Sequence, residues 1–290
     1  MKYSHFKVLW QGISRVSGIR SAVLIGLTAI LFTSCSKVEE EPRPIFKYPL
    51  PDLIDPEVAA RLTESYETES YIFYYAAGDS VEFDRCEAYA QWGMEYLGVT
   101  LPKKIEFYKF RSYEEMGEAL PSPAGGWAFS ENVAFATMFT WHNHECMHIL
   151  AYWWTDGSYP PSFFMEGMAV AHEYDPYNDD WVSRWNRAEI GEPWLDIVKQ
   201  LNAEGKLYSL DDILESQSFW DNIEQEEERI AYTQAGMFTA YLIETYGLEK
   251  FKEVYSSLNY DDTLQVILDQ FISTYGISLE TIEQDWLNTL

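Results

Sequence analysis

The residues able to do chemistry gather in TWHNHECMHILAYWW, residues 140–154. This stretch holds three of the chain's five histidines, His142, His144 and His148, together with Glu145. On a helix, the H-E-x-x-H spacing places two imidazoles on one face, where both can bind one Zn²⁺ ion. Glu145 is rotated by ~100° from His144, so its carboxylate would lie beside the metal and act as a base toward water. The stretch therefore predicts a zinc centre with His144 and His148 as ligands.

A third ligand is needed, because catalytic zinc sites use three protein ligands and keep one position open. The close spacing of the metzincins would place a histidine at Trp154, with Ala151 where that pattern has glycine, so this alternative fails. Asp156 follows His148 by only eight residues and is expected to end or flank the same helix. Glu166 is the better candidate, because it lies on a separate predicted helix.

Glu166 stands in SFFMEGMAVAHEY, after a loop rich in glycine and proline that can turn the chain back. A carboxylate among apolar neighbours such as Phe164 and Met165 needs a partner, and a zinc ion would serve. The small residues Gly167 and Ala169 would let this second helix approach the first one closely. We therefore expect Glu166 to be the third ligand.

The pattern H-E-x-x-H, then 17 residues, then E-G-x-A resembles the gluzincin metallopeptidases, and more closely the small secreted peptidase-MA-like domains. Residues 231–255 (AYTQAGMFTAYLIETYGLEKFKEVY) and 276–290 (GISLETIEQDWLNTL) share the likeness, which covers roughly residues 100–290. The resemblance implies an α+β, zincin-like fold. Such a fold begins with a small mixed sheet, whose edge strand lies along the cleft. The active-site helix follows, and then a mainly helical C-terminal half.

The same resemblance implies a zinc-dependent peptidase, expected to be an endopeptidase, acting on a peptide or protein substrate. Zn²⁺ would be held by His144, His148 and Glu166, and Glu145 would be the catalytic base. Exopeptidase activity is not carried over, because the spacing from residues 131–132 to His144 is too short for the amine-binding pattern of the aminopeptidases.

Three further residues have weaker assignments. Tyr232 matches a tyrosine that in gluzincins often donates a hydrogen bond to the oxyanion, although a chain with 21 tyrosines has many that only pack. His142, two residues before the first ligand, could contact the ligands or the edge of the cleft. His172, six residues after Glu166, could contact the ligands or the substrate, or it could simply end the helix.

The folded part is expected to pass from mixed to helical structure. Gly98 should end a helix, and Ser112 with Glu115 forms a capping-box signature. Residues 127–132 (WAFSEN) could form an edge strand that pairs with an extended peptide. After Trp141 the sequence predicts helices with short loops. The expected elements before that point are a helix, a strand, a helix and one or two strands, at residues 83–98, 103–110, 112–120 and 127–139.

The first 34 residues predict a lipoprotein signal peptide. They carry four basic and no acidic residues, then the apolar run SAVLIGLTAILFT, which is too short to span a bilayer. The run ends in FTSC, which resembles a lipobox with Cys35 as the lipidated residue; an ordinary cleaved signal is the alternative. The following SKVEEE resembles the surface-export tag of Bacteroidetes-type lipoproteins. Residues 35–56, with five prolines, predict an extended tether, and residues 57–290 the folded domain.

The net charge of −27 becomes −31 once the four basic residues of the leader are removed. Such a field repels phosphate backbones and anionic lipid, so nucleic-acid binding is disfavoured and membrane attachment must come from the lipid anchor. The expected location is the cell envelope, anchored to the outer membrane and facing the surface. Cys86 and Cys146 could form a disulfide or remain two buried thiols.

A surface binding module is the alternative function. Eleven tryptophans and the polar, Trp-rich segment at residues 173–194 could contact glycans or proteins. An intact base at Glu145 favours catalysis, because a pure binding protein has no need for it. A purely structural zinc ion fits poorly, since structural zinc sites are closed by four protein ligands.

Overall fold

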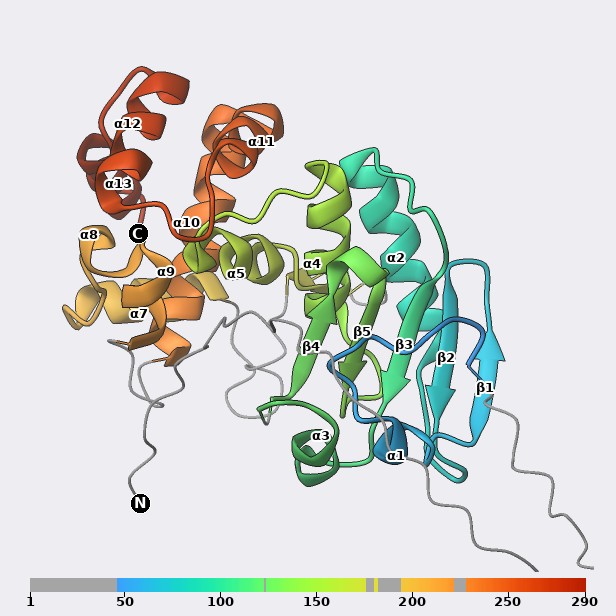
Figure 1. Ribbon diagram of the computed structural model, residues 1–290. Helices are drawn as coiled ribbons and strands as arrows, with labels where there is room; N and C mark the ends of the chain where they lie inside the picture. Colours follow the sequence, from blue (N-terminus) through green and yellow to red (C-terminus); the bar gives the residue numbers. More distant parts are fainter. Residues whose placement is uncertain (1–45, 123, 176–179, 182–193, 222–227) are drawn as a thin grey trace, which may run out of the picture. The chain divides into compact units, whose positions relative to one another are not determined.

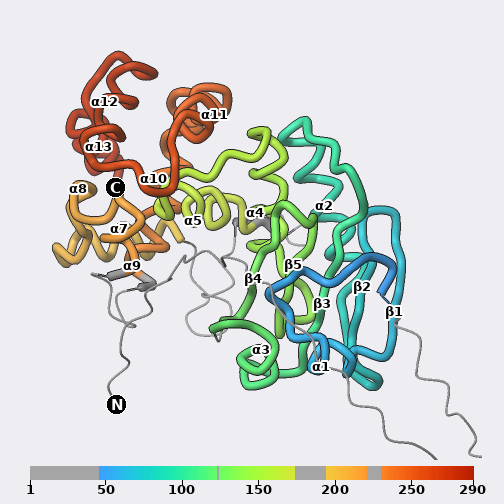
Figure 2. The backbone as a smooth tube through the Cα atoms, in the orientation of Figure 1, coloured from blue at the N-terminus to red at the C-terminus, as the bar shows by residue number. Residues whose placement is uncertain are grey.

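The computed structural model describes residues 46–290, except residues 123, 176–179, 182–193 and 222–227. The predicted signal peptide, Cys35 and the first part of the predicted tether lie outside the described residues, as does most of the Trp-rich segment. The described chain forms a mixed five-stranded sheet followed by a mainly helical C-terminal half (Figure 1 and Figure 2). The α+β class expected from the sequence is confirmed.

The sheet has the strand order β1-β2-β3-β5-β4, which leaves β4 at one edge and β1 at the other (Figure 1). Strands β2, β3 and β5 run parallel, while β1 and β4 pair antiparallel with their neighbours. The register sets Phe107 between Phe73 and Phe135, with ring centroids 5.2 and 4.7 Å away. The strands are β1 (Glu64–Glu67), β2 (Tyr71–Tyr75), β3 (Ile105–Lys109), β4 (Gly126–Phe129) and β5 (Ala134–Thr137).

Successive strand residues point to opposite faces of the sheet, so two apolar layers form. Phe73 and Phe135 belong to the larger layer, whereas Tyr74 and Tyr108 belong to the smaller one on the opposite face. The larger layer continues into the helical half, which makes it the main core of the protein. Helices α2 (Phe83–Leu97) and α4 (Asn143–Trp154) cover the face with the larger layer. Helices α1 (Pro56–Ala59) and α3 (Tyr113–Ala119) cover the face with the smaller layer.

Residues just before α1 belong to the smaller layer. Phe46 packs edge-to-face on Tyr74, with 5.0 Å between the ring centroids, and the backbone N–H of Lys47 donates to the Tyr74 hydroxyl over 2.9 Å. Ile54 is buried. The proline-rich composition predicts that residues 46–56 belong to an extended tether, whereas in the structure they pack against the sheet. The difference arises because their apolar side chains cover an aromatic face of the sheet that would otherwise meet water.

The local signals for α2 and α3 are confirmed. Gly98 ends α2 in the left-handed conformation, with φ of 64°. Ser112 accepts a hydrogen bond from the backbone N–H of Glu115 at the start of α3. The Glu115 carboxylate reaches one residue further than a capping box requires and accepts from the backbone N–H of Arg111 over 2.6 Å.

The helical half is built around the pair α5 (Ser162–Ala171) and α10 (Glu228–Tyr246). A Cβ atom on Gly167 would lie 2.7 Å from the backbone oxygen of Ala235, and one on Gly236 would lie 2.2 Å from Val170 Cγ1. Gly167 therefore lets α5 approach α10, and not α4 as the sequence analysis expects. The other elements are β6 (Tyr174–Asp175), β7 (Asp180–Trp181), α7 (Trp194–Ala203), α8 (Leu210–Ile213), α9 (Ser216–Asp221), α11 (Leu248–Ser257), α12 (Leu264–Tyr275) and α13 (Leu279–Leu287).

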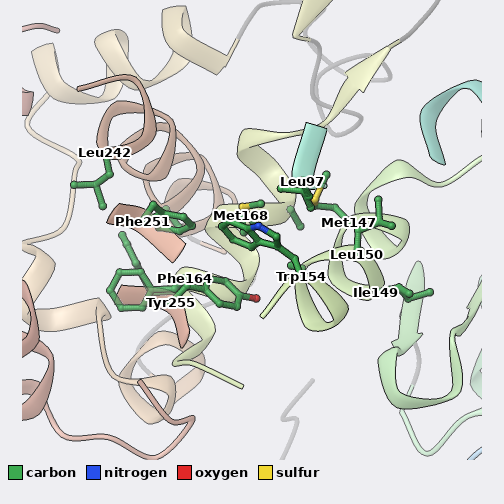
Figure 3. Close-up of a cluster of buried hydrophobic side chains, with 14 of the residues drawn as sticks. Leu97, Met147, Ile149, Leu150, Trp154, Phe164, Met168, Leu242, Phe251 and Tyr255 are labelled. Atoms are coloured by element: carbon green, nitrogen blue, oxygen red, sulfur yellow. The ribbon is translucent and has the colours of Figure 1, made fainter. Parts of the chain in front are cut away.

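Helix α4 lies between the sheet and the helical half and is buried on most sides (Figure 1). Leu150 faces α2, where Gly93 leaves room for its side chain. Trp154 at the end of the helix reaches toward Met168 and Tyr255 of the helical half (Figure 3). Apolar packing on both sides therefore holds α4 in place.

Cys86 and Cys146 are both buried free thiols, and the Tyr71 hydroxyl donates to Cys146 Sγ over 3.1 Å. Of the two possibilities that the sequence leaves open, the structure has the reduced pair. None of the described helices is both long and apolar enough to span a bilayer.

We predict that Gly167→Ala destabilises the protein by about 1–3 kcal/mol, because the new methyl group would meet the α10 backbone, which cannot move aside. Gly117→Ala is the matched control: Gly117 is an exposed residue of α3, where alanine favours the helix by up to about 1 kcal/mol. Chemical denaturation of both variants gives the free energies of unfolding. Equal stability of the two variants would contradict the close contact between α5 and α10.

Candidate metal centre and cleft

Helix α4 carries the H-E-x-x-H residues at its first turns. His142 is the N-cap residue, and Asn143 Oδ1 accepts a hydrogen bond from the backbone N–H of His144 over 3.0 Å. Helical geometry then puts His144 and His148 on one side of the helix, with 4.8 Å between their ring centroids. The two histidines are therefore close together, as the spacing predicts.

Glu166 of α5 meets both imidazoles. Its Oε2 atom lies 3.0 Å from His144 Nε2 and 3.4 Å from His148 Nε2, and the two nitrogens are 3.1 Å apart. Zinc–ligand bonds of ~2.0–2.1 Å in tetrahedral geometry put ligand atoms about 3.3 Å from one another. The donor set and its spacing therefore fit a zinc ion, with a fourth position left for water or substrate.

The electrostatics of the centre also favour a bound cation. Burial lowers the pKa of His144, but its hydrogen bonds with Glu166 and Glu173 outweigh burial and raise that pKa to about 10. Burial raises the pKa of Glu166, but the nearby His148 and His144 hold it well below its usual range. A proton on His144 thus compensates the carboxylates, and a metal cation would take over this role.

Glu173 completes the centre, and the sequence analysis does not identify it. Its Oε1 atom lies 2.9 Å from His144 Nδ1, and the residue is 1% exposed. A carboxylate on the far nitrogen of a histidine holds the proton there, so that Nε2 offers its lone pair to a metal. The available signal in the sequence is an acidic residue seven positions after Glu166, about two helical turns further on.

Glu145 lies against the edge strand. It is 8% exposed, and its Oε1 atom is 3.9 Å from Nε2 of His142, whose Nδ1 atom lies 2.7 Å from Thr137 Oγ1 of β5. A Cβ atom on Gly126 of β4 would lie 2.4 Å from Glu145 Oε1 and 2.1 Å from His142 Cε1. Only glycine lets β4 pass this close to the base, a constraint that no motif in the sequence indicates.

The other two predicted residues have different surroundings. Tyr232 of α10 lies over the centre, with its ring centroid 6.2 Å from that of His144. His172 ends α5, where its Nδ1–H donates to the Met168 carbonyl over 2.8 Å. Burial lowers the pKa of His172 to about 4, so the ring is neutral. It lines a separate cavity of about 290 Å³ behind Glu173.

A cleft of about 490 Å³ opens over the centre. Gly126, Trp127 and Ala128 of the edge strand form one side of it. Side chains of α4, α5, α9, α10 and α11 form most of the rest, together with residues of the loops before β4, after β4 and before α5. No lysine or arginine occurs among the described lining residues. The predicted residues that line this one cleft are His144, Glu145, His148, Glu166 and Tyr232.

Comparison with protein-family models and with curated proteins finds no match for this chain. The resemblance to the gluzincins therefore rests on the motif residues, and a function can be inferred only from the geometry of the site. Within that site His142 contacts the base from the β5 side, whereas His172 lies away from the cleft.

We predict that Glu173→Gln weakens divalent-metal binding about 10- to 100-fold, because the neutral side chain no longer stabilises the proton on His144 Nδ1. Competition with a chromogenic chelator measures the affinity. Glu106→Gln is the control, since Glu106 is an equally buried carboxylate of β3 that pairs with Lys103 and Tyr108 instead. If both variants bind the metal as tightly as the wild type, Glu173 has no part in the centre.

Proposed function

We propose that the protein is a zinc-dependent endopeptidase with a zincin-like fold. The observation that carries the proposal is the convergence of one atom each from His144, His148 and Glu166 beside Glu145 in a single cleft. Three protein ligands with an open fourth position are typical of catalytic zinc and not of structural zinc. The edge strand along the cleft, the helix α4 and the helical second half support the zincin-like arrangement.

When bound, the metal ion would supply Lewis acidity, which acidifies a water molecule and polarises the scissile carbonyl. Glu145 would take the proton of the attacking water and pass it to the leaving amine. Its carboxylate is held between Gly126 and His142 at the cleft, which restricts it to one position. Tyr232 would donate its hydroxyl to the oxygen that becomes negatively charged.

A peptide is the substrate class that suits the edge strand. An edge strand presents backbone N–H and C=O groups that a second strand can pair with, and two of the three β4 residues that line the cleft, Gly126 and Ala128, have small side chains or none. Among the described lining residues, the charged groups all belong to the centre: Glu145, Glu166 and the protonated His144. Outside the centre the described lining offers neither a carboxylate for a terminal amine nor a cation for a terminal carboxylate, which favours cleavage within a chain.

We further propose that the enzyme acts in the cell envelope as a lipoprotein anchored through Cys35. Support comes from the basic, apolar leader and the FTSC sequence. The strongly negative net charge would keep the domain away from anionic lipid, so that a tethered catalytic domain faces its substrates and not the membrane.

We predict that the purified protein holds one zinc ion per chain and that Glu145→Gln keeps the metal but lowers kcat/KM about 10²–10⁴-fold, the contribution expected of a general base. Metal content follows from elemental analysis, and cleavage from mass spectrometry of a peptide library. Unchanged proteolysis by Glu145→Gln would falsify the mechanism. Zinc binding without any cleavage by the wild type would instead favour the binding module.

We predict that Gly126→Ala lowers kcat by about 10²-fold, because its methyl group would displace the Glu145 carboxylate, and misplacing a catalytic group by ~1 Å costs that much. The neighbouring Gly125→Ala is the control: its Cβ would lie 3.0 Å from a Phe139 ring atom, which can yield. Steady-state kinetics and thermal unfolding of both variants separate catalysis from folding. Equal kcat values in the two variants would show that the approach of β4 to Glu145 is unimportant for the reaction.

A further inference from the structure

The cleft contains a second group of residues that the proposed mechanism does not use. Tyr152, Tyr159, Trp220 and Tyr255 line it beyond the metal centre. Tyr159 and Trp220 are 45% and 42% exposed, a large aromatic surface left in contact with water. We propose that these four rings form a subsite for an aromatic side chain of the peptide substrate, on the N-terminal side of the scissile bond; the inference rests on the proposed peptidase function.

Trp220 is held in place as a stacking surface. Its indole N–H donates to Ser162 Oγ over 2.7 Å, and the backbone N–H of Ser162 donates to Ser216 Oγ over 2.9 Å. These bonds join the first turn of α5 to α9. The ring is therefore already ordered while much of its surface remains exposed, so binding a second ring against it costs little side-chain entropy.

The same rings lie close to the reaction centre. The Trp220 ring centroid is 6.2 Å from that of Tyr232, which in turn is 6.2 Å from His144. Tyr152 follows His148 by one turn of α4, and its ring lies 6.0 Å from Tyr159 at an interplanar angle of 71°. Edge-to-face and offset arrangements at such distances are those that aromatic side chains prefer.

The charges around the subsite disfavour anionic side chains. Burial and the nearby Glu131 raise the pKa of both the Tyr152 and the Tyr159 hydroxyl, so the subsite surroundings are already electronegative. An anionic side chain would lose its hydration without meeting a cation. Glu145 and Glu166 are engaged at the metal centre, so Glu131 is the carboxylate that a cationic side chain could meet. A neutral ring avoids the cost that an anion meets, and a lysine peptide is the test that separates it from a cation.

The direction of the substrate follows from the edge strand. Gly126, at the start of β4, contacts Glu145. Ser130, just after β4, accepts a hydrogen bond from the indole of Trp153, which lies beside Tyr152. Antiparallel pairing is the more stable form of strand addition, and a peptide bound in this way runs opposite to β4. Its residues before the scissile bond then lie at the Tyr152 end of the cleft.

Binding tests the subsite without depending on turnover. Fluorescent peptides of small residues with a single Phe, Ala, Glu or Lys are titrated against Glu145→Gln protein and followed by fluorescence anisotropy. The Phe peptide should bind about three- to tenfold more tightly than the Ala peptide. Tighter binding of the Glu or Lys peptide, or of a peptide with a glycosylated serine, would overturn the proposal.

Variants connect the preference to the rings. Tyr159→Ala, made in the same protein, should remove most of the preference for Phe, and Tyr159→Phe should keep it. Tyr66→Ala is the matched control: Tyr66 is 49% exposed on β1, the opposite edge of the sheet (Figure 1), and its removal should leave the preference unchanged. An unchanged preference in Tyr159→Ala would contradict the assignment.

Cleavage mapping with the wild type tests the direction and separates the two proposals. Aromatic residues should be enriched among the positions before the cut bond. Enrichment after the bond, or none, would overturn the subsite while leaving the peptidase intact. Selective binding of the Phe peptide with no cleavage of any peptide would have the opposite meaning: the hydrolytic function would fail, and aromatic recognition would stand.

Discussion

The imidazole of His144 lies between two carboxylates, and the candidate centre depends on this contact. Glu166 meets Nε2 at 3.0 Å and Glu173 meets Nδ1 at 2.9 Å. Buried carboxylates cost several kcal/mol each unless a positive charge compensates them, and a proton on His144 supplies that charge here. The contact also requires both carboxylates to reach α4. Helix α5 carries Glu166, and Glu173 follows the end of this helix. The close packing of α5 on α10 through Gly167 and Gly236 holds both in position.

Much of the centre follows from the sequence because its spacing is local. His144 and His148 are four residues apart on a helix, which places them on one side whatever the tertiary structure is. Glu166 could be chosen because an acidic residue among phenylalanines and methionines needs a partner. The alternation of residues 103–110 and the glycine at Gly98 likewise predict structure through local geometry, and the structure confirms both elements.

The residues that sequence reasoning misses depend on contacts between distant parts of the chain. Glu173 is indicated in the sequence only by its position seven residues after Glu166. Its contact with His144 joins residues 29 apart in sequence and 2.9 Å apart in space. Gly126 looks like part of a turn, yet it is needed because α4 passes beside the edge strand. The packing of residues 46–56 on the sheet is missed for the same reason, since a proline-rich composition describes the chain and not the surface that it covers.

The cleft contains two sets of residues, one buried and one partly exposed. The proposed base and the proposed ligands are at most 13% exposed and are held by the core, so their positions tolerate little change. The aromatic rings beyond them belong to the end of α4, the loop before α5, and helices α9 and α11, and two of these rings stay exposed. Trp220 links the two sets, because the serine that holds its indole begins the helix that carries Glu166. In the proposed peptidase, a change at Tyr159 would therefore alter the aromatic subsite and leave the metal centre in place, whereas a change at Trp220 would also act on the helix that carries Glu166.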